Sequence, residues 1–405
     1  MDLTSGAPFW IIRDGLPAVY PKLKRDRVCD VAVIGGGITG ALVAHRFTQE
    51  GIHIVLVEGR EIGHGSTGAT TALIQYEIDS SLCDLTDRVG QAHAVRSYQL
   101  CQEAVHGIER LATEVGDGDG CGYRRKKSLY LASRPRDRAI LQQECEARRR
   151  MGIEVEFLDR QDIAQRFSFQ RPAALLSQLA GEVDAYRLTH KLIAAAVSRG
   201  LEVYDRTVVS GIETHNEGVE LTTKDGCHVR ARKVVFATGY ETPEYLDQRI
   251  IKLNSTFALA TAVVDGFDGW GEDQCLIWET ARPYFYARTT SDGRIIMGGA
   301  DRPFATAHKQ DKLLSRQTAR LRSQFTKLFP RIAIDVDWSW GGTFGETKDG
   351  LPYISTVSQF PHGYFALGYG GNGITFSYIA ANLLLDLYLQ RRNPDLEIFR
   401  FDRLL

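Results

Sequence analysis

Short apolar runs and a helical pattern alternate over the first 60 residues of the chain. Residues 31–34 and 55–57 are uninterrupted apolar runs, which are typical of strands buried on both faces of a parallel sheet. Residues 40–47, which lie between them, carry the pattern of a helix. This strand–helix–strand order predicts the first unit of a Rossmann-like α/β domain.

The pattern changes character further along the chain. Elements that continue the first domain are predicted as helices at 84–115 and 187–199, a strand at 201–204, alternating strands through 208–231, an apolar strand ending at 237–239 and a helix at 374–389. Elements of a different, strand-rich character are predicted as strands at 129–131, 256–264, 275–278, 284–289 and 294–298, with helices at 136–151 and 310–328. The second set is interpreted as a mainly antiparallel domain inserted between parts of the first.

These patterns predict a two-domain α/β fold. The nucleotide-binding domain is expected in three parts, 1–110, 151–244 and 339–405. The second domain, mainly antiparallel β, is expected from 111–150 and 245–338. A chain of 405 residues exceeds what one compact core usually holds, so its length agrees with two domains.

A glycine-rich turn joins the first predicted strand to its helix. Gly35 permits the tight turn, Gly37 lets the backbone approach a phosphate, and Gly40 allows the helix to pack closely on the strand. Ile38 and Thr39 open the helix, whose N-terminus would face a pyrophosphate. The turn therefore predicts a dinucleotide site.

Glu58 ends the second predicted strand, roughly 20 residues beyond the glycines, where a carboxylate accepts hydrogen bonds from ribose hydroxyls. Other segments rich in small and hydroxyl-bearing residues, or at the start of the last helix, are expected to line the same ligand. These further candidates are Gly65, Ser66, Thr67, Val208, Ala237, Thr238, Gly239, Gly371, Asn372, Gly373 and Ile374.

Composition excludes several classes of function. The 49 lysines and arginines balance 50 aspartates and glutamates, which argues against nucleic acid or a membrane surface as a partner. The 7 cysteines are odd in number and scattered, so we expect neither a disulfide framework nor a metal site, and we expect a cytoplasmic protein. Residues 1–30 contain no signal-like apolar run, and the helix at 374–389 is interpreted as packed within the protein and not as a transmembrane segment.

Several motifs together carry a family resemblance. They are, in chain order, Pro8-Phe9-Trp10, the run from Cys29 to Gly40, Gly63-x-Gly65 with Thr67-Gly68, Ala237-Thr238-Gly239, the run from Gly293 to Gly299, the run from Asp349 to Ile354, and Gly370 to Gly373. With these motifs the chain resembles the D-amino acid oxidase, glycine oxidase and sarcosine oxidase superfamily of FAD-dependent oxidoreductases, most closely its gamma-glutamylputrescine oxidase-like branch. The resemblance implies FAD as the cofactor, with the isoalloxazine ring between the two domains.

Three positions depart from the pattern of this superfamily. Phe344 stands where glycine oxidase-like relatives carry an arginine for the substrate carboxylate, and Thr375 stands where sarcosine oxidase-like relatives carry a lysine. Because burying an unpaired carboxylate costs several kcal/mol, an amine without an α-carboxylate becomes the favoured substrate. Gly342 stands near the position of the flavin-tethering cysteine of sarcosine oxidases, so the resemblance implies non-covalent FAD.

Candidate catalytic residues come from the inserted domain. Tyr284, Tyr286 and Arg288 alternate along one predicted strand, so they share one face, which in the family faces the substrate. The alternative is an aromatic core with Arg288 at its rim. Backbone N–H groups at 370–373 and the dipole of the following helix are expected to stabilise negative charge on the flavin.

The sequence leaves three functions open. The leading one is an FAD-dependent amine oxidoreductase that produces an imine, with oxygen, a quinone or an electron-transfer protein as the electron acceptor. The second is an amino acid oxidase or dehydrogenase in which Arg282 or Arg288 binds the carboxylate. The third is a catalytically silent flavin protein that acts as a redox sensor or an assembly subunit.

Overall fold

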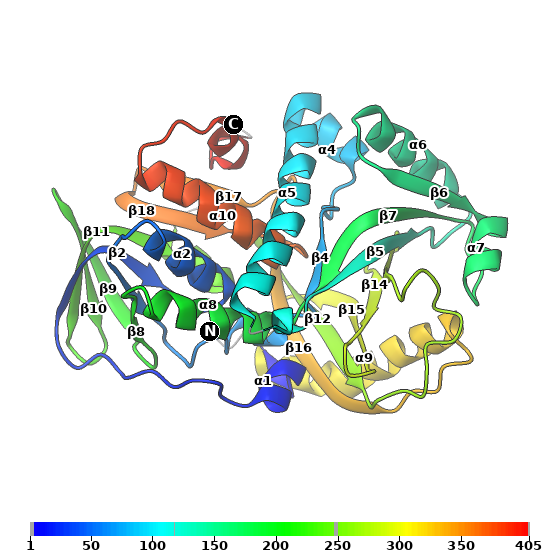
Figure 1. Ribbon diagram of the computed structural model, residues 1–405, viewed down its shortest axis with the longest axis horizontal. Coiled ribbons are helices and arrows are strands. Elements are labelled where there is room, and N and C mark those ends of the chain that lie inside the picture. The colour runs from blue at the N-terminus through cyan, green and yellow to red at the C-terminus, as the bar shows by residue number, and fades with distance from the viewer. Residues whose placement is uncertain (1–3, 117, 247–249, 404–405) are drawn as a thin grey trace.

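The computed structural model describes residues 4–116, 118–246 and 250–403. The strands of this part of the chain form two β-sheets that lie side by side (Figure 1). The first sheet has eight strands in the described part of the chain. Its strands are β2 (Arg27–Ile34), β3 (Ile54–Val57), β8 (Glu202–Tyr204), β9 (Val209–His215), β10 (Gly218–Thr223), β11 (His228–Phe236), β17 (Tyr353–Val357) and β18 (Phe360–Leu367).

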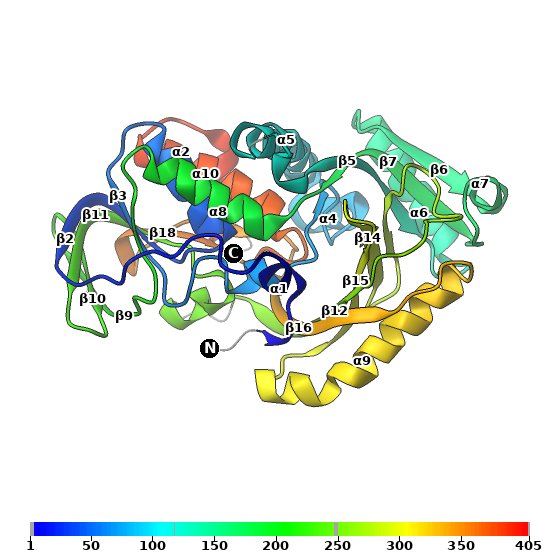
Figure 2. The ribbon, with the colours of Figure 1, turned by 60° about the horizontal axis from the view of Figure 1, so that its bottom comes forward.

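The eight-stranded sheet has the parallel strands that the sequence predicts for a Rossmann-like domain. Its path runs β17-β18-β11-β2-β3-β8, and the pairs β18–β11, β11–β2, β2–β3 and β3–β8 are parallel. Parallel strands need covered faces, and the residues of β3 are accordingly all buried. The helices α2 (Ile38–Thr48), α8 (Ala185–Val197) and α10 (Gly373–Tyr388) pack together over this sheet (Figure 2).

The second sheet has ten strands among the described residues. They are β1 (Ser5–Gly6), β4 (Leu73–Gln75), β5 (Arg124–Leu131), β6 (Val155–Asp159), β7 (Ala173–Glu182), β12 (Lys252–Thr261), β13 (Leu276–Glu279), β14 (Phe285–Thr289), β15 (Ile295–Pro303) and β16 (Val336–Glu346). Its neighbours pair antiparallel except β13 with β5, so the mainly antiparallel character expected of the inserted domain is present.

The ten-stranded sheet draws on more of the chain than the sequence patterns suggest. Strands β6 and β7 lie within 151–244, and β16 runs from 336 to 346, yet all three pair into this sheet. The helix α9 (Ala307–Leu328) covers its outer face along β12 and β16, where Leu321 and Phe325 join Phe257 and Leu259 in one buried cluster (Figure 2). The domain boundaries therefore remain a proposal, with 151–182 better grouped with the strand-rich domain.

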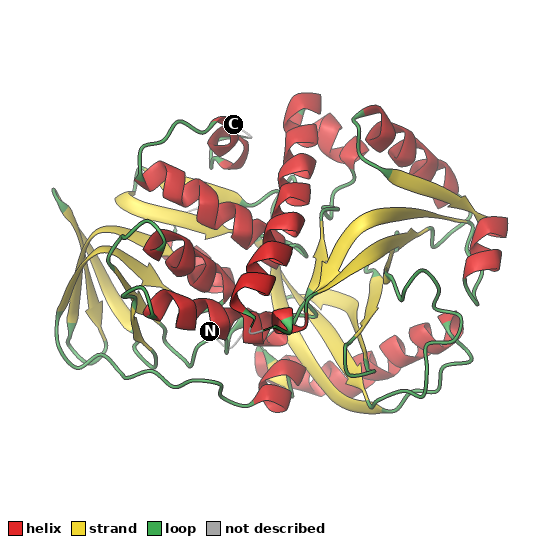
Figure 3. Ribbon diagram, viewed as in Figure 1, coloured by secondary structure: helices red, strands yellow, loops and turns green. Residues whose placement is uncertain are grey.

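The remaining helices connect and cover the two sheets (Figure 3). They are α1 (Phe9–Asp14), α3 (Ser66–Ala69), α4 (Leu82–Val89), α5 (Gln91–Val115), α6 (Asp137–Arg150) and α7 (Arg160–Arg166), with short 3-10 turns at Gly120–Gly122, Gly239–Tyr245 and Pro394–Phe399. The prediction of a single helix at 84–115 is wrong. Gly90 adopts a φ of 84°, which ends α4 and separates it from α5. Among the described helices, none is both long and apolar enough to cross a membrane.

Candidate active site

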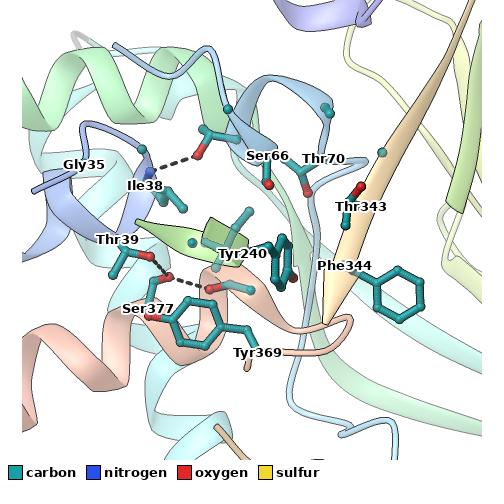
Figure 4. A pocket seen from close by; sticks show the side chains of 18 of the residues that line it. Gly35, Ile38, Thr39, Ser66, Thr70, Tyr240, Thr343, Phe344, Tyr369 and Ser377 are labelled. Carbon is teal, nitrogen blue, oxygen red and sulfur yellow. Dashed lines mark hydrogen bonds between the residues drawn. The ribbon is translucent and has the colours of Figure 1, made fainter. Parts of the chain in front are cut away.

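A cavity of about 520 Å³ lies between the two sheets and receives residues from both (Figure 4). One part is formed by the turn after β2, the end of β3, the helix α3 and the start of α10. Another part is formed by β12, the β14–β15 pair and β16. The volume is within the range of ordinary ligand and cofactor sites, and the position between domains is a common one for them.

The glycine turn after β2 is built as its sequence predicts. Gly35 has a φ of 111°, and a Cβ on it would strike the carbonyl group of Ala237 on β11's continuation. A Cβ on Gly40 would strike the carbonyl oxygen of Gly35, so Gly40 packs the helix against the turn and does not line the cavity. The close approach of three backbone segments therefore depends on two glycines.

Glu58 lies at the end of β3 and lines the cavity. Its carboxylate accepts hydrogen bonds from the backbone N–H of Gly36 (2.6 Å) and of Arg60 (2.7 Å). Burial raises the pKa of Glu58, and the two N–H bonds act in the opposite direction. The carboxylate is thus oriented by backbone donors beside the turn where a ribose is expected.

The helix α2 is tied to its neighbours by side-chain hydroxyls (Figure 4). The N–H of Ile38 donates to Oγ1 of Thr67, which connects the start of α2 to α3 at 2.9 Å. The hydroxyls of Thr39 and Ser377 are 2.7 Å apart and join α2 to α10. These bonds hold three segments of the first sheet's surface around one end of the cavity.

The structure brings together nearly all the residues proposed for cofactor binding. Those that line the cavity are Gly35, Gly37, Ile38, Thr39, Glu58, Gly65, Ser66, Thr67, Val208, Ala237, Thr238, Gly239, Gly371, Asn372, Gly373 and Ile374. They come from separate parts of the chain and converge on one cavity. Their contacts with FAD stay a prediction.

The segment Ala69–Thr71 passes along the cavity, and three side chains hold its carbonyl groups from outside. Trp340 donates from its indole nitrogen to the carbonyl oxygen of Ala69 at 2.8 Å. Trp10 donates to Thr70 at 2.6 Å, and Arg288 donates through Nε to Thr71 at 2.7 Å. Residues from α1, β14 and β16 therefore fix one wall of the cavity without lining it.

The turn before α10 is braced in a similar way. The N–H of Gly371 donates to a carboxylate oxygen of Asp79 at 2.8 Å. The side-chain amide of Asn372 donates to the carbonyl oxygen of Glu77 at 2.7 Å. The hydroxyl of Tyr240 donates to the carbonyl oxygen of Gly370 at 3.2 Å. The braces hold the N-terminus of α10 toward the cavity, which is the arrangement expected for backbone donors that stabilise an anionic ring edge.

Two of the three candidate catalytic residues line the cavity. Tyr284 and Tyr286 both do so, and the hydroxyl of Tyr284 donates to Asp79 at 3.1 Å. Burial raises the pKa of Tyr284 well above its usual value and that of Tyr286 to about 12. Both phenols are therefore hydrogen-bond donors across the physiological pH range.

Arg288 is placed differently from the two tyrosines. It is 2% exposed, and it is not among the described residues that line the cavity. Its guanidinium contacts the carbonyl oxygen of Val183 at 3.1 Å, a carboxylate oxygen of Glu182 at 3.5 Å and the ring of Trp10. Alternation along β14 does put it on the tyrosine face, but that face extends beyond the cavity to α1.

The two positions where relatives carry carboxylate anchors are placed differently, one at the cavity and one outside its described lining. Phe344 lines the cavity (Figure 4), as does Gly342. The hydroxyl of Thr375 donates to the carbonyl oxygen of Gln75 at 3.1 Å, and the residue is buried outside the described lining. The seven cysteines all lie in the described part of the chain, and the lining includes none of them.

Sequence reasoning missed four acidic residues of the cavity: Glu241, which pairs with Arg60, and three others. Glu77 and Asp79 follow β4, and Asp301 lies on β15 just after the Gly298-Gly299 pair. A local signal was available in the sequence. Glu77 and Asp79 follow a segment of small and hydroxyl-bearing residues that was expected to line the cofactor, and Asp301 follows the family motif at 293–299. Trp278 also lines the cavity, whereas Trp340 donates to Ala69 from outside it.

The residues of the cavity suit FAD. The glycine turn can be approached by phosphates because a Cβ is excluded there, Glu58 supplies a fixed carboxylate, and the N-terminus of α10 supplies backbone donors. Hydroxyls from Ser66 and Thr67 add polar contacts on the same wall. The donor set therefore fits an anionic dinucleotide that carries a flavin.

Comparison with known proteins assigns the family. Residues 30–387 match the model of the DAO family, described as FAD dependent oxidoreductase. The chain is 24% identical to the gamma-glutamylputrescine oxidoreductase of Escherichia coli, in an alignment that covers 91% of this chain and 86% of that protein. It is also 24% identical to the glycine oxidase of Bacillus subtilis, in an alignment that covers 92% of this chain and 97% of that protein.

Solved structures agree on the fold. The glycine oxidase of Geobacillus kaustophilus superposes with a TM-score of 0.75 over 93% of this chain and 98% of that one, at 21% identity. This likeness confirms the two-domain architecture expected from the sequence. Together with the family match across most of the chain, it means that the chain belongs to the DAO family of FAD-dependent oxidoreductases.

Proposed function

We propose that this chain oxidises the C–N bond of a small amine, N-substituted diamines included, to an imine, with FAD held non-covalently in the cavity between the sheets. When bound, FAD accepts a hydride at flavin N5. Glu58 would hold the ribose, the turn at 35–39 the pyrophosphate, and the backbone of 371–374 the anionic edge of the ring. The imine then hydrolyses to an aldehyde and ammonia or a smaller amine.

The observation that carries the amine proposal is the environment of Phe344. It lines the cavity where a relative's arginine would bind a carboxylate, and no lysine or arginine joins it on the described β12, β14–β15 and β16 walls. Arg288 is occupied by Glu182 and two carbonyl groups. An α-amino acid would have to bury its carboxylate without a cation of the lining, which costs several kcal/mol.

The chain's own side chains would orient the amine and exclude water from it. Tyr284 and Tyr286 offer phenol donors and ring faces toward the substrate, and Phe344 adds an apolar wall. A neutral amine is needed at the reacting nitrogen, and an apolar wall disfavours its protonated form by desolvation. These residues therefore bind and position the substrate; we assign none of them a covalent step.

A second candidate, amino acid oxidation, is favoured by the relatives named glycine oxidase and by Arg282. The Arg282 guanidinium lies 4.8 Å from the ring centre of Tyr284, next to the cavity, and its Nη2 donates to the backbone oxygen of Asp79. A carboxylate that reached this guanidinium would be paired. The experiment below therefore compares an amine directly with the amino acid that differs from it by one carboxylate.

The test is anaerobic reduction of the bound flavin, followed by the loss of its yellow absorbance. Butylamine is compared with 2-aminopentanoic acid, and 1,4-diaminobutane with ornithine. Faster reduction by the amine of each pair supports the proposal, and faster reduction by the amino acid supports the second candidate. Reduction by neither type of compound would point to a silent flavin protein. The same reactions in air, with a peroxide assay, test oxygen against a quinone or an electron-transfer protein as acceptor.

A further inference from the structure

Three carboxylates line the cavity where the two sheets face each other. Glu77 and Asp79 come from the segment after β4, and Asp301 comes from β15 of the same sheet. They lie far apart in the sequence, and each is contributed to the cavity independently of the glycine turn at 35–40. The fold therefore concentrates negative charge on the wall assigned to the substrate.

The lining does not balance this charge with a cation of its own. Among the described lining residues, the lysine and arginine are Lys224 and Arg60, and both follow strands of the eight-stranded sheet. The guanidinium of Arg60 pairs with the carboxylate of Glu241 at 2.9 Å, and the backbone of Lys224 lies next to the cofactor candidate Val208. Both cations therefore belong to the cofactor side, and the substrate wall keeps its acids.

Two of the three acids have unused acceptors. Asp79 is held by two hydrogen bonds, as described above, but Glu77 is 3% exposed and neither of its carboxylate oxygens has a hydrogen-bond partner in the described structure. Its nearest cation, Arg148, places Nη1 3.8 Å away. Oδ1 of Asp301 is also buried without a donor among the described residues. Because Glu77 has Arg148 as its ion-pair partner, Oδ1 of Asp301 is the oxygen of the three acids that is left for a ligand. Buried acceptors are ordinarily paired, so this oxygen is suited to a ligand that donates an N–H group.

Aromatic rings stand beside the acids. The rings of Tyr284 and Tyr286 have centroids 5.6 Å apart, and Trp278 meets Tyr284 edge-on at 6.4 Å. All three residues line the cavity with Asp301. Ring faces attract ammonium groups, and a carboxylate among such rings selects a cation over a neutral polar group. The chemistry of this wall is that of a cation-binding subsite.

We propose that the substrate is a diamine whose second, protonated amino group binds the Asp301 carboxylate beside Trp278, Tyr284 and Tyr286. The proposal rests on amine oxidation as the function of the cavity, and it further specifies that the substrate carries a second, positively charged amino group. The reacting amino group must be neutral when its C–H bond is broken, whereas the second amino group keeps its proton. Asp301 thus determines which amines are preferred and takes no proton from the reacting nitrogen.

The proposal includes a dependence on pH. Burial and the charges of Asp79 and Glu346 raise the pKa of Asp301, while a hydrogen bond with Thr256 and the charge of Arg282 lower it, and the net result is a pKa raised to about 6. The phenols of Tyr284 and Tyr286 face the same carboxyl group and do not ionise in this range. Since the folded-state pKa is raised, the carboxylate is charged above about pH 6 and neutral below it. Affinity for a diamine should fall as the pH drops through this value.

The test uses Asp301→Asn in the FAD-loaded protein. Stopped-flow reduction gives an apparent Kd and a limiting rate for 1,4-diaminobutane and for pentylamine, in which a methyl group replaces the second ammonium. We expect wild-type protein to bind the diamine more tightly, and Asp301→Asn to reduce the ratio of the two affinities by about 10- to 100-fold, the range for loss of a charged hydrogen bond. Asp311→Asn, the same change on the exposed face of α9, should leave the ratio unchanged.

Each outcome decides the proposal. An unchanged ratio in Asp301→Asn, or an equal fall in the limiting rate for both amines with no change in ratio, overturns it while amine oxidation stands. Reduction by amino acids and not by amines overturns the proposed function and this inference together. If Asp301→Asn does not fold, the wild-type protein still decides: the diamine-to-pentylamine affinity ratio must fall below about pH 6. A ratio independent of pH contradicts the proposal.

Discussion

Nε of Arg288 donates a 2.7 Å hydrogen bond to the carbonyl oxygen of Thr71, and the same guanidinium faces the buried carboxylate of Glu182. Thr71 lines the cavity and Arg288 does not. A residue proposed from sequence as a substrate ligand thus holds the wall of the site from behind. Its substitution should affect the wall and the fold more than the choice of substrate.

Arg288→Met should lower the free energy of unfolding by about 3–5 kcal/mol, because the change leaves Glu182 buried without its partner. It should also weaken FAD binding, since Thr71 loses its donor. Turnover of a simple amine by the fraction that retains FAD should remain within about tenfold of wild type, because loss of an indirect contact costs on the order of 1 kcal/mol.

Urea unfolding and FAD titration measure the first two effects, and Arg302→Met, an exposed change on β15, is the control. A stable Arg288→Met protein that loses activity toward an α-amino acid by several hundredfold would instead place Arg288 in carboxylate binding. In that case the amino acid oxidase interpretation should replace the amine proposal.

Glu58→Gln should weaken FAD affinity by about tenfold or more. The N–H groups of Gly36 and Arg60 orient the carboxylate, which is expected to accept charge-assisted hydrogen bonds from the ribose hydroxyls, each worth roughly 1.5–3 kcal/mol. A glutamine keeps the shape but replaces one acceptor by a donor that faces an N–H. Fluorescence titration of the apoprotein with FAD measures the affinity, with Glu217→Gln on the exposed β9–β10 turn as the control. Equal affinity in Glu58→Gln and wild type would mean that Glu58 does not contact the ribose.

Gly40→Ala should destabilise the protein strongly, and Gly65→Ala should not. A Cβ on Gly40 would overlap the carbonyl oxygen of Gly35, and only a shift of backbone can relieve the overlap, whereas a Cβ on Gly65 meets nothing within 4 Å. We expect a loss of at least about 1–3 kcal/mol for the first change and within about 0.5 kcal/mol for the second. Thermal unfolding of the two apoproteins gives the comparison. Similar midpoints for both variants would mean that helix α2 can move away from the turn at little cost.

Flavin should be released when the protein is denatured in acid. The reason is the absence of cysteine from the described lining, with Gly342 at the position of the tether. The supernatant should be yellow and should contain FAD by chromatography. A precipitated chain that retains its flavin after washing would show a covalent link and would direct attention to His64, which is outside the lining and 3.2 Å from the hydroxyl of Tyr186.

The cofactor half of the site could be predicted from sequence because its residues act through the backbone. Gly35 and Glu58 occupy fixed positions on a strand–turn–helix–strand unit, so their spacing along the chain determines their spacing in the fold. Alternation likewise placed Tyr284 and Tyr286 on one face of the predicted strand at 284–289.

The acids of the substrate wall could not be predicted in this way. Glu77 and Asp301 meet at one cavity because β4 and β15 are brought to the same region by a ten-stranded sheet whose order no local pattern specifies. Alternation also could not show where along its face the cavity ends, which is why Arg288 was grouped with the tyrosines. The strands β6 and β7 were not predicted: no strand is expected over 155–159 or 173–182, and both pair into the ten-stranded sheet.

The short segment after β4 serves two purposes at once. The carbonyl groups of Gln75 and Glu77 and the carboxylate of Asp79 brace the turn before α10, and all three residues also line the cavity. Asp301 reaches the cavity from another strand and takes no part in that brace. A change in the backbone of residues 75–79 would therefore also disturb the turn before α10, whereas a change of the Asp301 side chain would leave that turn braced.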